Sequence, residues 1–456
     1  MDAKDDSQRH DWTGVGALSL GWALSFSVVT ASITASNLAG RQFSPGAAFN
    51  TVPLAVLLIS LSAWSFALPR LFEAFGGRLS VYRITSAVGM VASVVAAVAC
   101  ASRSFAALCI ASAMFGLPSA AGQTFRFAAL SMVPKSSHPK CIGAVLTGGI
   151  VGALVGPSYA AGSTDLFPDA KYAGVYLCTG VAFLGILIIM LIPGLVTFHA
   201  EHDTDEEDRD DARADAPPDS KPKPPSAVSA AFARPNAVAA VIVSALSYAA
   251  MSFLMSPTPL AMRALGYSLP RVSHVIMTHM VGMYAPSFFT GAAVARFGFA
   301  SVSVAGVAVI AASSGIMRSG TSFAHFICGQ GLLGVGWNLC FVASTSEVAK
   351  TSLEVTAAAG GSASERAAGA RQVQSASDAA TFAAAGIASI SSGAALADLG
   401  WNGMQTVGWS ASAAAAAAVL VAAAAERSFG TDDDADDVAD ATKPEAASAD
   451  AGDDRV

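Results

Sequence analysis

The sequence predicts an all-α integral membrane protein with twelve transmembrane helices arranged as two six-helix bundles. Its 456 residues are 53% hydrophobic and only 13% charged, whereas an average soluble domain has about 25% charged residues. Apolar runs of about 20 residues, the length needed to cross a bilayer as a helix, occur twelve times. An acidic, proline-rich segment separates these runs into two sets of six, which predicts two bundles.

The twelve runs are distributed evenly over the two halves. Those of the first half cover 14–38, 48–68, 84–102, 105–133, 141–163 and 172–197. Those of the second half cover 236–262, 272–294, 299–318, 322–349, 371–397 and 403–425. The first run is longer than the apolar region of a typical secretory signal peptide, so we expect it to be retained. The eleventh is rich in Ser and Ala and crosses only where neighbouring helices shield it.

The acidic residues are concentrated outside the apolar runs. Residues 201–223 hold ten acids and four bases, and residues 431–456 hold ten acids and two bases. Such segments cannot bury a core, and we expect them to be disordered. The predicted division is therefore a cytoplasmic N-terminus (1–13), a first bundle (14–197), a disordered linker (198–235), a second bundle (236–425) and a disordered cytoplasmic tail (426–456).

The distribution of Lys and Arg predicts the orientation in the membrane. With the N-terminus inside, nineteen of these residues fall in cytoplasmic segments and six on the opposite side. Cytoplasmic loops carry the excess of positive charge in membrane proteins, so both termini are expected in the cytoplasm. The plasma membrane is the default location, with an organelle membrane as the alternative.

Polar side chains recur on one face of every third apolar run. In the first run, four polar residues from Ser27 to Asn37 are spaced 3, 4 and 3 apart, which places them on one side of a helix. Similar stripes in the fourth, seventh and tenth runs predict an aqueous cavity shared by these four helices. Alternatively, Ser and Thr hydroxyls bond back to their own helix. The predicted lining residues are Thr34, Asn37, Gln123, Arg126, Tyr248, Thr258, Gln330 and Asn338.

Ionisable residues inside the apolar runs are candidates for substrate binding and coupling, because a charge in a membrane span is costly. Arg126 is expected to hold an anionic group or pair with an acid, or else to extend toward lipid headgroups. Asp378 either pairs with Arg371 or Lys350 or couples transport to protons. His279 titrates near neutral pH in its free form, and the alternative is a neutral, hydrogen-bonded core histidine.

Further charged residues lie at the ends of the apolar runs and are candidates for gating. Glu347 is expected to pair with Lys350 or Arg371. Glu73 and Arg78 are expected to hold helix ends together in one conformational state. The predicted coupling and gating residues are Glu73, Arg78, His279, Glu347, Arg371 and Asp378.

A short motif is repeated at equivalent places in the two halves. Residues 71–78 (LFEAFGGR) follow the second run and residues 291–298 (GAAVARFG) follow the eighth. The first resembles the loop between helices two and three of the major facilitator superfamily, which Glu73, Phe75, Gly76 and Arg78 match, while Pro69 and Ala74 depart from it. The second repeat matches at Gly291, Arg296, Phe297 and Gly298, with Ala295 in place of the acid.

The fifth run has a small-residue stripe, Gly148, Gly152 and Gly156, followed by Pro157. Glycines at this spacing let a neighbouring backbone approach closely. The stretch is similar to the antiporter signature of the same superfamily, but Ala160 and Ala161 stand where that signature has glycines, so antiport is not supported. Four more stretches (126–129, 257–262, 285–291 and 334–338) resemble a bacterial-type branch of the superfamily with mostly unassigned substrates.

This resemblance implies a monomeric secondary active transporter that moves a small solute by alternating access, with protons as a candidate coupling ion. The alternative is a transport-inactive receptor or scaffold with the same fold. The partners are then a small-molecule substrate and the lipid bilayer, with no nucleic acid. Neither a catalytic residue set nor a metal-ligand cluster is evident, and the six cysteines form no C-x-x-C pair, so no enzyme activity, cofactor or metal site is expected.

Overall fold

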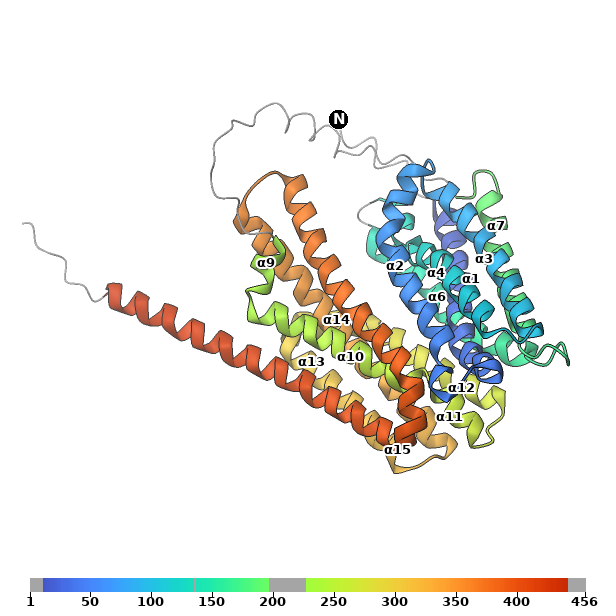
Figure 1. Cartoon of the computed structure of the whole chain (residues 1–456). Coiled ribbons are helices and arrows are strands. Elements are labelled where there is room, and N and C mark those ends of the chain that lie inside the picture. Colours follow the sequence, from blue (N-terminus) through green and yellow to red (C-terminus); the bar gives the residue numbers. More distant parts are fainter. Residues whose placement is uncertain (1–10, 135–136, 197–226, 442–456) are drawn as a thin grey trace, which may run out of the picture.

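The computed structural model describes residues 11–134, 137–196 and 227–441. Within these ranges the secondary structure consists of helices and contains no strand. Figure 1 shows two helical bundles, one from each half of the chain.

The first half forms six crossings. Its elements are α1 (Trp12–Phe43), η2 (Ala47–Phe49), α2 (Val52–Ala74), α3 (Arg78–Ala101), α4 (Phe105–Gln123), α5 (Phe125–Ala128), η3 (Ala129–Met132), α6 (His138–Ser163) and α7 (Ala173–Leu191). The fourth predicted crossing is interrupted at Thr124, so α4, α5 and η3 together make it. Asp11 caps α1, because its side chain accepts a hydrogen bond from the Gly14 N–H at 2.8 Å.

The second half also forms six crossings. Its elements are α9 (Ala227–Phe232), α10 (Pro235–Met255), α11 (Thr258–Ala264), α12 (Leu269–Tyr284), α13 (Ser287–Ser319), α14 (Phe323–Ala359) and α15 (Ala363–Ala441). Helices α13 and α15 are bent at Gly298 (φ 79°) and Gly400 (φ 66°), a backbone conformation that glycine adopts without steric cost. Each bend lets the chain turn back across the bundle.

These two bends account for the number of crossings. The described residues contain ten continuous apolar stretches suited to a membrane, and two of them, Leu269–Ser319 and Ala368–Ala425, are 51 and 58 residues long. A single crossing needs about 20 residues, so each long stretch supplies two. The predicted twelve-helix architecture is confirmed.

The repeated motif forms a tight turn in both halves. In the first half Gly76 and Gly77 have φ values of 71° and 109° between α2 and α3, and in the second half Gly298 occupies the corresponding bend. These glycines therefore allow the chain to reverse direction between two successive helices.

Helical structure extends into two segments for which the sequence predicts disorder. Helix α9 lies within the predicted linker, where the run AVSAAF is apolar enough to pack and Ala231 is fully buried. Helix α15 continues from the Ala-rich twelfth crossing through Ala441, consistent with the high helix propensity of alanine. Residues 198–226 and 442–456 of the predicted linker and tail lie outside the described residues.

In each half, two helices pack closely along glycine residues, and we call these contacts the glycine seams. A Cβ atom at Gly148, Gly152 or Gly156 of α6 would come within 3 Å of a backbone carbonyl oxygen of α1, as the small-residue stripe predicts. In the second half, Gly306 of α13 and Gly336 of α14 also approach closely, because a Cβ atom on either would lie within 3 Å of the other residue's carbonyl oxygen. Both pairs of helices are packed backbone to backbone.

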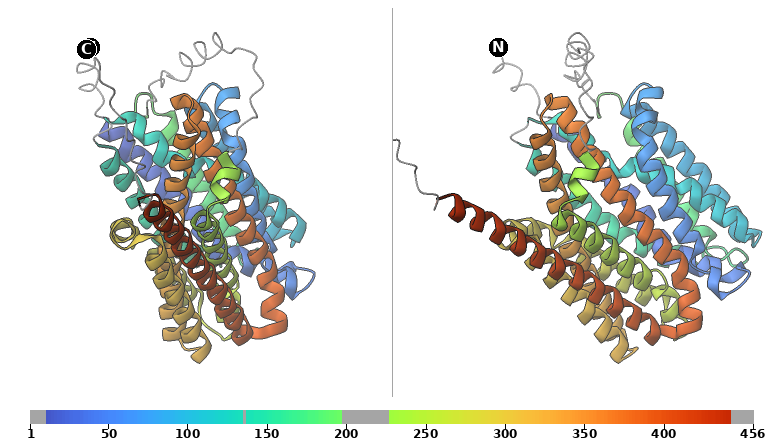
Figure 2. Two further views of the ribbon diagram at one scale, coloured as in Figure 1. Left: turned by 90° about the vertical axis from the view of Figure 1, so that its left-hand side faces the viewer. Right: turned by 60° about the vertical axis from the view of Figure 1, so that its left-hand side comes forward.

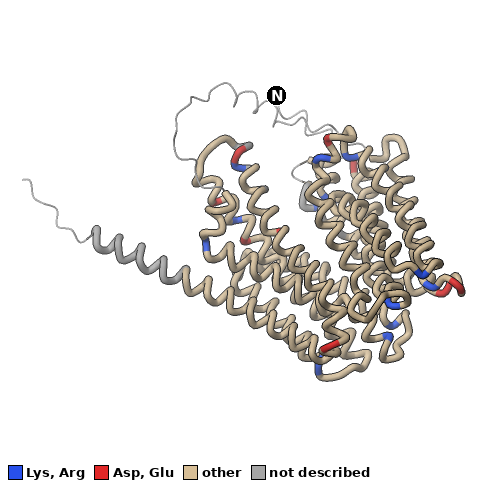
Figure 3. The backbone as a smooth tube through the Cα atoms, in the orientation of Figure 1, with Lys and Arg blue, Asp and Glu red and all other residues tan. Residues whose placement is uncertain are grey.

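The outer surface suits a lipid environment. Large apolar side chains such as Val181, Leu420 and Val94 are more than half exposed. Figure 3 shows most charged residues near the ends of the helices, with long uncharged stretches between them. In a bilayer core, backbone groups must be paired within a helix, and charged side chains are costly there. Long helices with apolar outer surfaces and charges near their ends therefore identify a multi-pass membrane protein.

Candidate functional site

A cavity of about 450 Å³ lies between the two halves of the chain. Its walls come from α1, α2, α4 and α5 on one side and from α10, α12, α14 and α15 on the other. The first, fourth, seventh and tenth crossings, which the polar stripes predicted to share a cavity, all contribute. The second, eighth and eleventh crossings line it as well.

Hydrogen bonds join the two halves at one end of the molecule, which we call the closed end. The Asn37 amide donates to the Ser256 carbonyl oxygen at 2.6 Å. The Thr51 hydroxyl donates to the Ile390 carbonyl at 3.4 Å and accepts from the Gly393 N–H at 3.1 Å. In Figures 1 and 2 the two bundles approach each other here and diverge toward the opposite end, where α9 lies.

Four aromatic residues of the second half form one wall of the cavity, here called the aromatic cluster: Tyr248, Trp337, Phe341 and Phe382. Trp337 and Phe341 are stacked with ring centroids 4.8 Å apart. The Tyr248 ring meets the other three edge-on, at 5.2, 5.9 and 5.6 Å. These are favourable geometries for aromatic pairs, so the cluster is a preformed platform of flat surfaces.

A further part of the cavity wall is apolar and flexible. Four methionines line it, Met251, Met255, Met280 and Met283. Two other lining residues, Phe26 of α1 and Tyr284 of α12, meet edge-to-face at 5.1 Å and so connect the two halves. Methionine side chains adapt their shape to a ligand and make favourable contacts with aromatic rings.

Two charged side chains face this cavity from opposite halves. Arg126 of α5 lies with its guanidinium carbon 4.8 Å from the centre of the Phe127 ring, and its Nε atom is buried without a hydrogen-bond partner. Asp378 of α15 is close enough for the charges of the two groups to act on each other. Within the described part of the chain, no hydrogen bond or ion pair connects them.

Of the predicted site residues, four line the cavity: Gln123, Arg126, Tyr248 and Asp378. Five predicted lining residues instead make buried polar contacts away from its wall: Thr34, Asn37, Thr258, Gln330 and Asn338. Of the four polar stripes, those of the fourth and seventh crossings reach the cavity, through Gln123, Arg126 and Tyr248. The first and tenth crossings line it with other side chains, such as Val29 and Trp337.

Four of these five residues join different helices, and Thr34 is the exception. The Thr34 hydroxyl bonds back to the Thr30 carbonyl of its own helix at 2.9 Å, as the alternative interpretation of the stripes proposed. The Gln330 amide donates to the Thr258 hydroxyl at 2.7 Å and so joins α14 to α11. Asn338 joins α14 to the α12–α13 region by donating to the Met283 carbonyl at 2.7 Å.

The predicted coupling and gating residues are spread over the molecule. His279 is fully buried, with Nδ1 2.9 Å from the Gln330 carbonyl oxygen and Nε2 without a partner, and it does not line the cavity. Glu73 is exposed at the end of α2, Arg78 begins α3, and Glu347 is half-buried on α14. The side chain of Arg371 lies outside the described residues.

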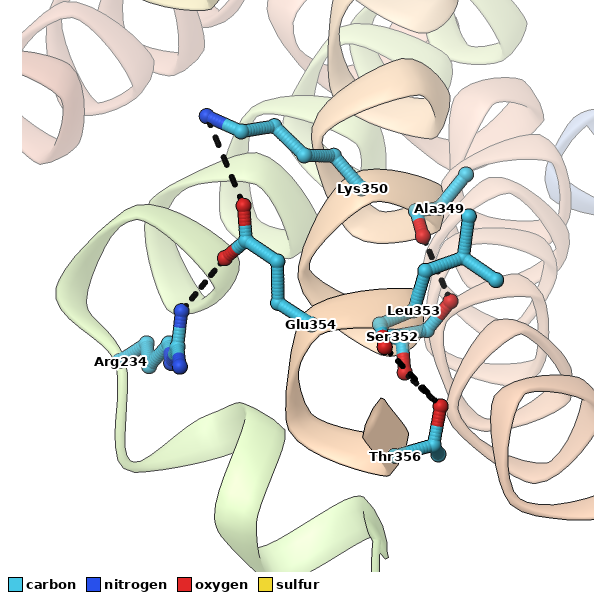
Figure 4. A network of polar contacts seen from close by, with 7 residues as sticks. All are labelled: Arg234, Ala349, Lys350, Ser352, Leu353, Glu354 and Thr356. Atoms are coloured by element: carbon cyan, nitrogen blue, oxygen red, sulfur yellow. Dashed lines mark hydrogen bonds and ion pairs between the residues drawn. The ribbon is translucent and has the colours of Figure 1, made fainter. Parts of the chain in front are cut away.

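An ion-pair network that the sequence did not predict ties the start of the second half to α14. Arg234 Nη1 lies 2.5 Å from Glu354 Oε2, and Lys350 Nζ lies 4.0 Å from the other oxygen of Glu354 (Figure 4). Lys350 is thus close to Glu354, and its predicted pairing with Glu347 or Asp378 stays a prediction. Nearby, Ser352 bonds back to its own helix.

Sequence reasoning missed the aromatic cluster apart from Tyr248. Phe and Trp are ordinary in apolar membrane helices, so their presence gives no signal by itself. Trp337 and Phe341 are four residues apart and therefore share a helix face, and Trp337 immediately precedes the polar Asn338. Two aromatic residues on one helix face beside a polar residue are the sequence pattern that could have indicated the aromatic wall of the cavity.

Comparisons with known sequences agree with this architecture. The family model described as Major Facilitator Superfamily matches residues 12–370. The chain is 29% identical over 396 residues to the riboflavin transporter RfnT of Brucella anthropi, covering 86% of this chain and 90% of that protein. It is 25% identical over 336 residues to the uncharacterized MFS-type transporter YddS of Bacillus subtilis, covering 72% and 73%.

Solved structures share the fold. A D-xylose–proton symporter superposes with a TM-score of 0.60 at 13% identity, and a bacterial homologue of the human lysosomal transporter Spinster, inward-facing and unoccupied, with 0.58 at 14%. Each comparison covers 90% of this chain and 95% of the other. With the family model spanning both bundles, twelve crossings and a cavity between two halves, the chain belongs to the Major Facilitator Superfamily of transporters.

Proposed function

We propose that this transporter moves a small solute by alternating access, with the cavity between the halves as its substrate site. The observation that carries the proposal is that both halves line one cavity and are hydrogen-bonded to each other at the closed end. Rocking of the halves about this site would expose the solute to one side at a time. One chain supplies both walls, which supports a monomer as the working unit.

The excess of Lys and Arg on the side of the termini supports a cytoplasmic location for them. The closed end then faces away from the cytoplasm, and the conformation described here is the inward-facing one.

We propose a planar aromatic heterocycle as the solute, with riboflavin as the first candidate. The aromatic cluster supports a flat ring system, because aromatic pairs contribute about 0.5–1.5 kcal/mol each beyond area burial. A volume of about 450 Å³ lies in the range of about 300–1,000 Å³ that is typical of small-molecule sites. Similarity to a riboflavin transporter over most of both chains points to the same class of solute.

The test is riboflavin uptake by the purified protein in proteoliposomes. We expect saturable uptake, lowered at least tenfold by Trp337→Ala because the stacked surface is lost. Trp64→Ala is the matched control, since Trp64 lies on α2 with 36% of its surface exposed and does not line the cavity. Absence of riboflavin uptake by the wild type, or equal loss in both variants, contradicts the proposed solute.

The same vesicles test proton coupling. Uptake that responds to an imposed pH gradient supports proton symport, with Asp378 as the titratable carboxyl that faces the cavity. Uptake that ignores the gradient excludes protons as the coupling ion.

A further inference from the structure

The charges that line the cavity balance. Among its described lining residues, Arg126 is the one cation and Asp378 the one anion, and all others are neutral. The two come from opposite halves of the molecule, α5 and α15, so that neither belongs to a local ion pair within a single bundle. The formal charge of the wall is therefore zero when Asp378 is ionised.

We infer that the cavity selects an electroneutral solute that presents a hydrogen-bond acceptor and a donor, and that Arg126 and Asp378 are the residues that set this selectivity. This inference rests on the proposed transport function. The sequence left open whether Arg126 holds an anionic group or pairs with an acid. The inference departs from the first alternative, because the carboxylate of Asp378 faces the same space.

Electrostatics favours a neutral solute in such a cavity. An ion between the two groups is attracted by one and repelled by the other, so their effects on a net charge largely cancel. An ion that enters the cavity loses its hydration without compensation, so binding of a charged solute there is unfavourable. A neutral molecule instead gains at both ends, accepting a hydrogen bond from the guanidinium and donating one to the carboxylate. Hydrogen bonds to charged groups are stronger than those between neutral groups.

Both side chains have hydrogen-bonding capacity to offer. Arg126 Nε is buried without a partner, and the guanidinium carbon lies 4.8 Å from the centre of the Phe127 ring, within the range of a cation–π contact. A guanidinium carries several N–H donors and a carboxylate two acceptor oxygens. Both side chains line the cavity, so both can bond to a solute there. The aromatic cluster lies in the same cavity, and a flat ring with polar edges can contact the cluster and both charges.

The electrostatic character of the cavity can be measured without knowing the solute. Ser62 of α2 lines the cavity, and its hydroxyl only bonds back to its own helix at 2.9 Å. On a background with the six native cysteines replaced, Ser62→Cys provides a thiol there. The measurement is the ratio of its reaction rates with an anionic and a cationic methanethiosulfonate of similar size, each relative to the rate with a small free thiol.

We expect a ratio within a few-fold of one in the parent protein. Asp378→Asn should raise the preference for the anionic reagent about tenfold, and Arg126→Gln should shift it about tenfold toward the cationic one. A double variant, Arg126→Gln with Asp378→Asn, is uncharged again and should return the ratio to the parent value. This last variant separates an effect of charge from a general disturbance of the fold.

A parent preference of tenfold or more for either ion, or ratios that do not move in opposite directions in the single variants, would overturn the inference. Binding of riboflavin and of its anionic 5′-phosphate is measured in parallel. If the reagent ratios shift as expected and riboflavin does not bind, the proposed solute is wrong while the charge selectivity stands. If riboflavin binds and the ratios do not move, the inferred charge selectivity is wrong while the proposed solute stands.

Discussion

A single methyl group added at Gly393 should open the closed end. The Cβ of an alanine there would lie 2.7 Å from Thr51 Oγ1 and 2.8 Å from the Ala48 carbonyl oxygen, both in the other half. The carbonyl belongs to the backbone and cannot rotate away as a side chain can. Overpacking of this kind costs about 1–3 kcal/mol.

This cost falls only on the conformation in which the halves touch. The better helix propensity of alanine, about 1 kcal/mol relative to glycine, stabilises both conformations equally and cancels. A difference of 1–3 kcal/mol shifts an equilibrium by a factor of about 5 to 150. Gly393→Ala should therefore shift the population by this factor toward the state in which the closed end is open.

The assay is a distance distribution between spin labels at Phe49 of η2 and Leu399 of α15, both about half exposed, with the native cysteines replaced. Gly393→Ala should increase the population at longer distances. Gly162→Ala is the matched control, because a Cβ at Gly162 has no atom within 4 Å. Identical distributions in the two variants would refute the reasoning that contact at Gly393 limits opening.

Three further predictions concern stability. Glu354→Gln should lower the melting temperature in detergent only slightly, since exposed pairs such as that with Arg234 contribute about 0–1 kcal/mol; a large drop would contradict this. Asn338→Ala should destabilise by about 1–3 kcal/mol, because buried partners lose their hydrogen bonds, and an unchanged denaturation midpoint would count against it. Gly152→Leu should greatly reduce the yield of folded monomer on size-exclusion chromatography, because its side chain would overlap the Ala23 carbonyl region; a normal yield would show that α1 and α6 can separate.

The crossings of the membrane could be predicted almost entirely from the sequence. Each requires a long apolar run, and such runs are conspicuous wherever they occur. The breaks and bends of the helices were harder to predict. The interruption at Thr124 lies between Gln123 and Phe125 and is marked by neither a proline nor a positive-φ glycine, whereas the bend at Gly298 coincides with a motif that both halves share.

The site was predicted in part. Arg126 and Asp378 are recognisable because an ionisable group in an apolar run is costly. Thr34 and Asn338 have the same polar character, but their hydrogen bonds are used within and between helices. Which part of a stripe reaches a cavity depends on how the helices are rotated and spaced. Trp337 was missed because a ring in an apolar helix looks like any other lipid-facing or core residue.

The glycine seams also bear on how this protein can change over evolutionary time. Where two backbones touch, as between Gly152 and α1 or between Gly306 and Gly336, almost any larger residue is harmful, so the frame of each half tolerates little variation. Side chains that point into the cavity face open space instead. A lineage can therefore replace rings and charges around the cargo, and acquire a new one, while the two frames and the motion between them are inherited unchanged.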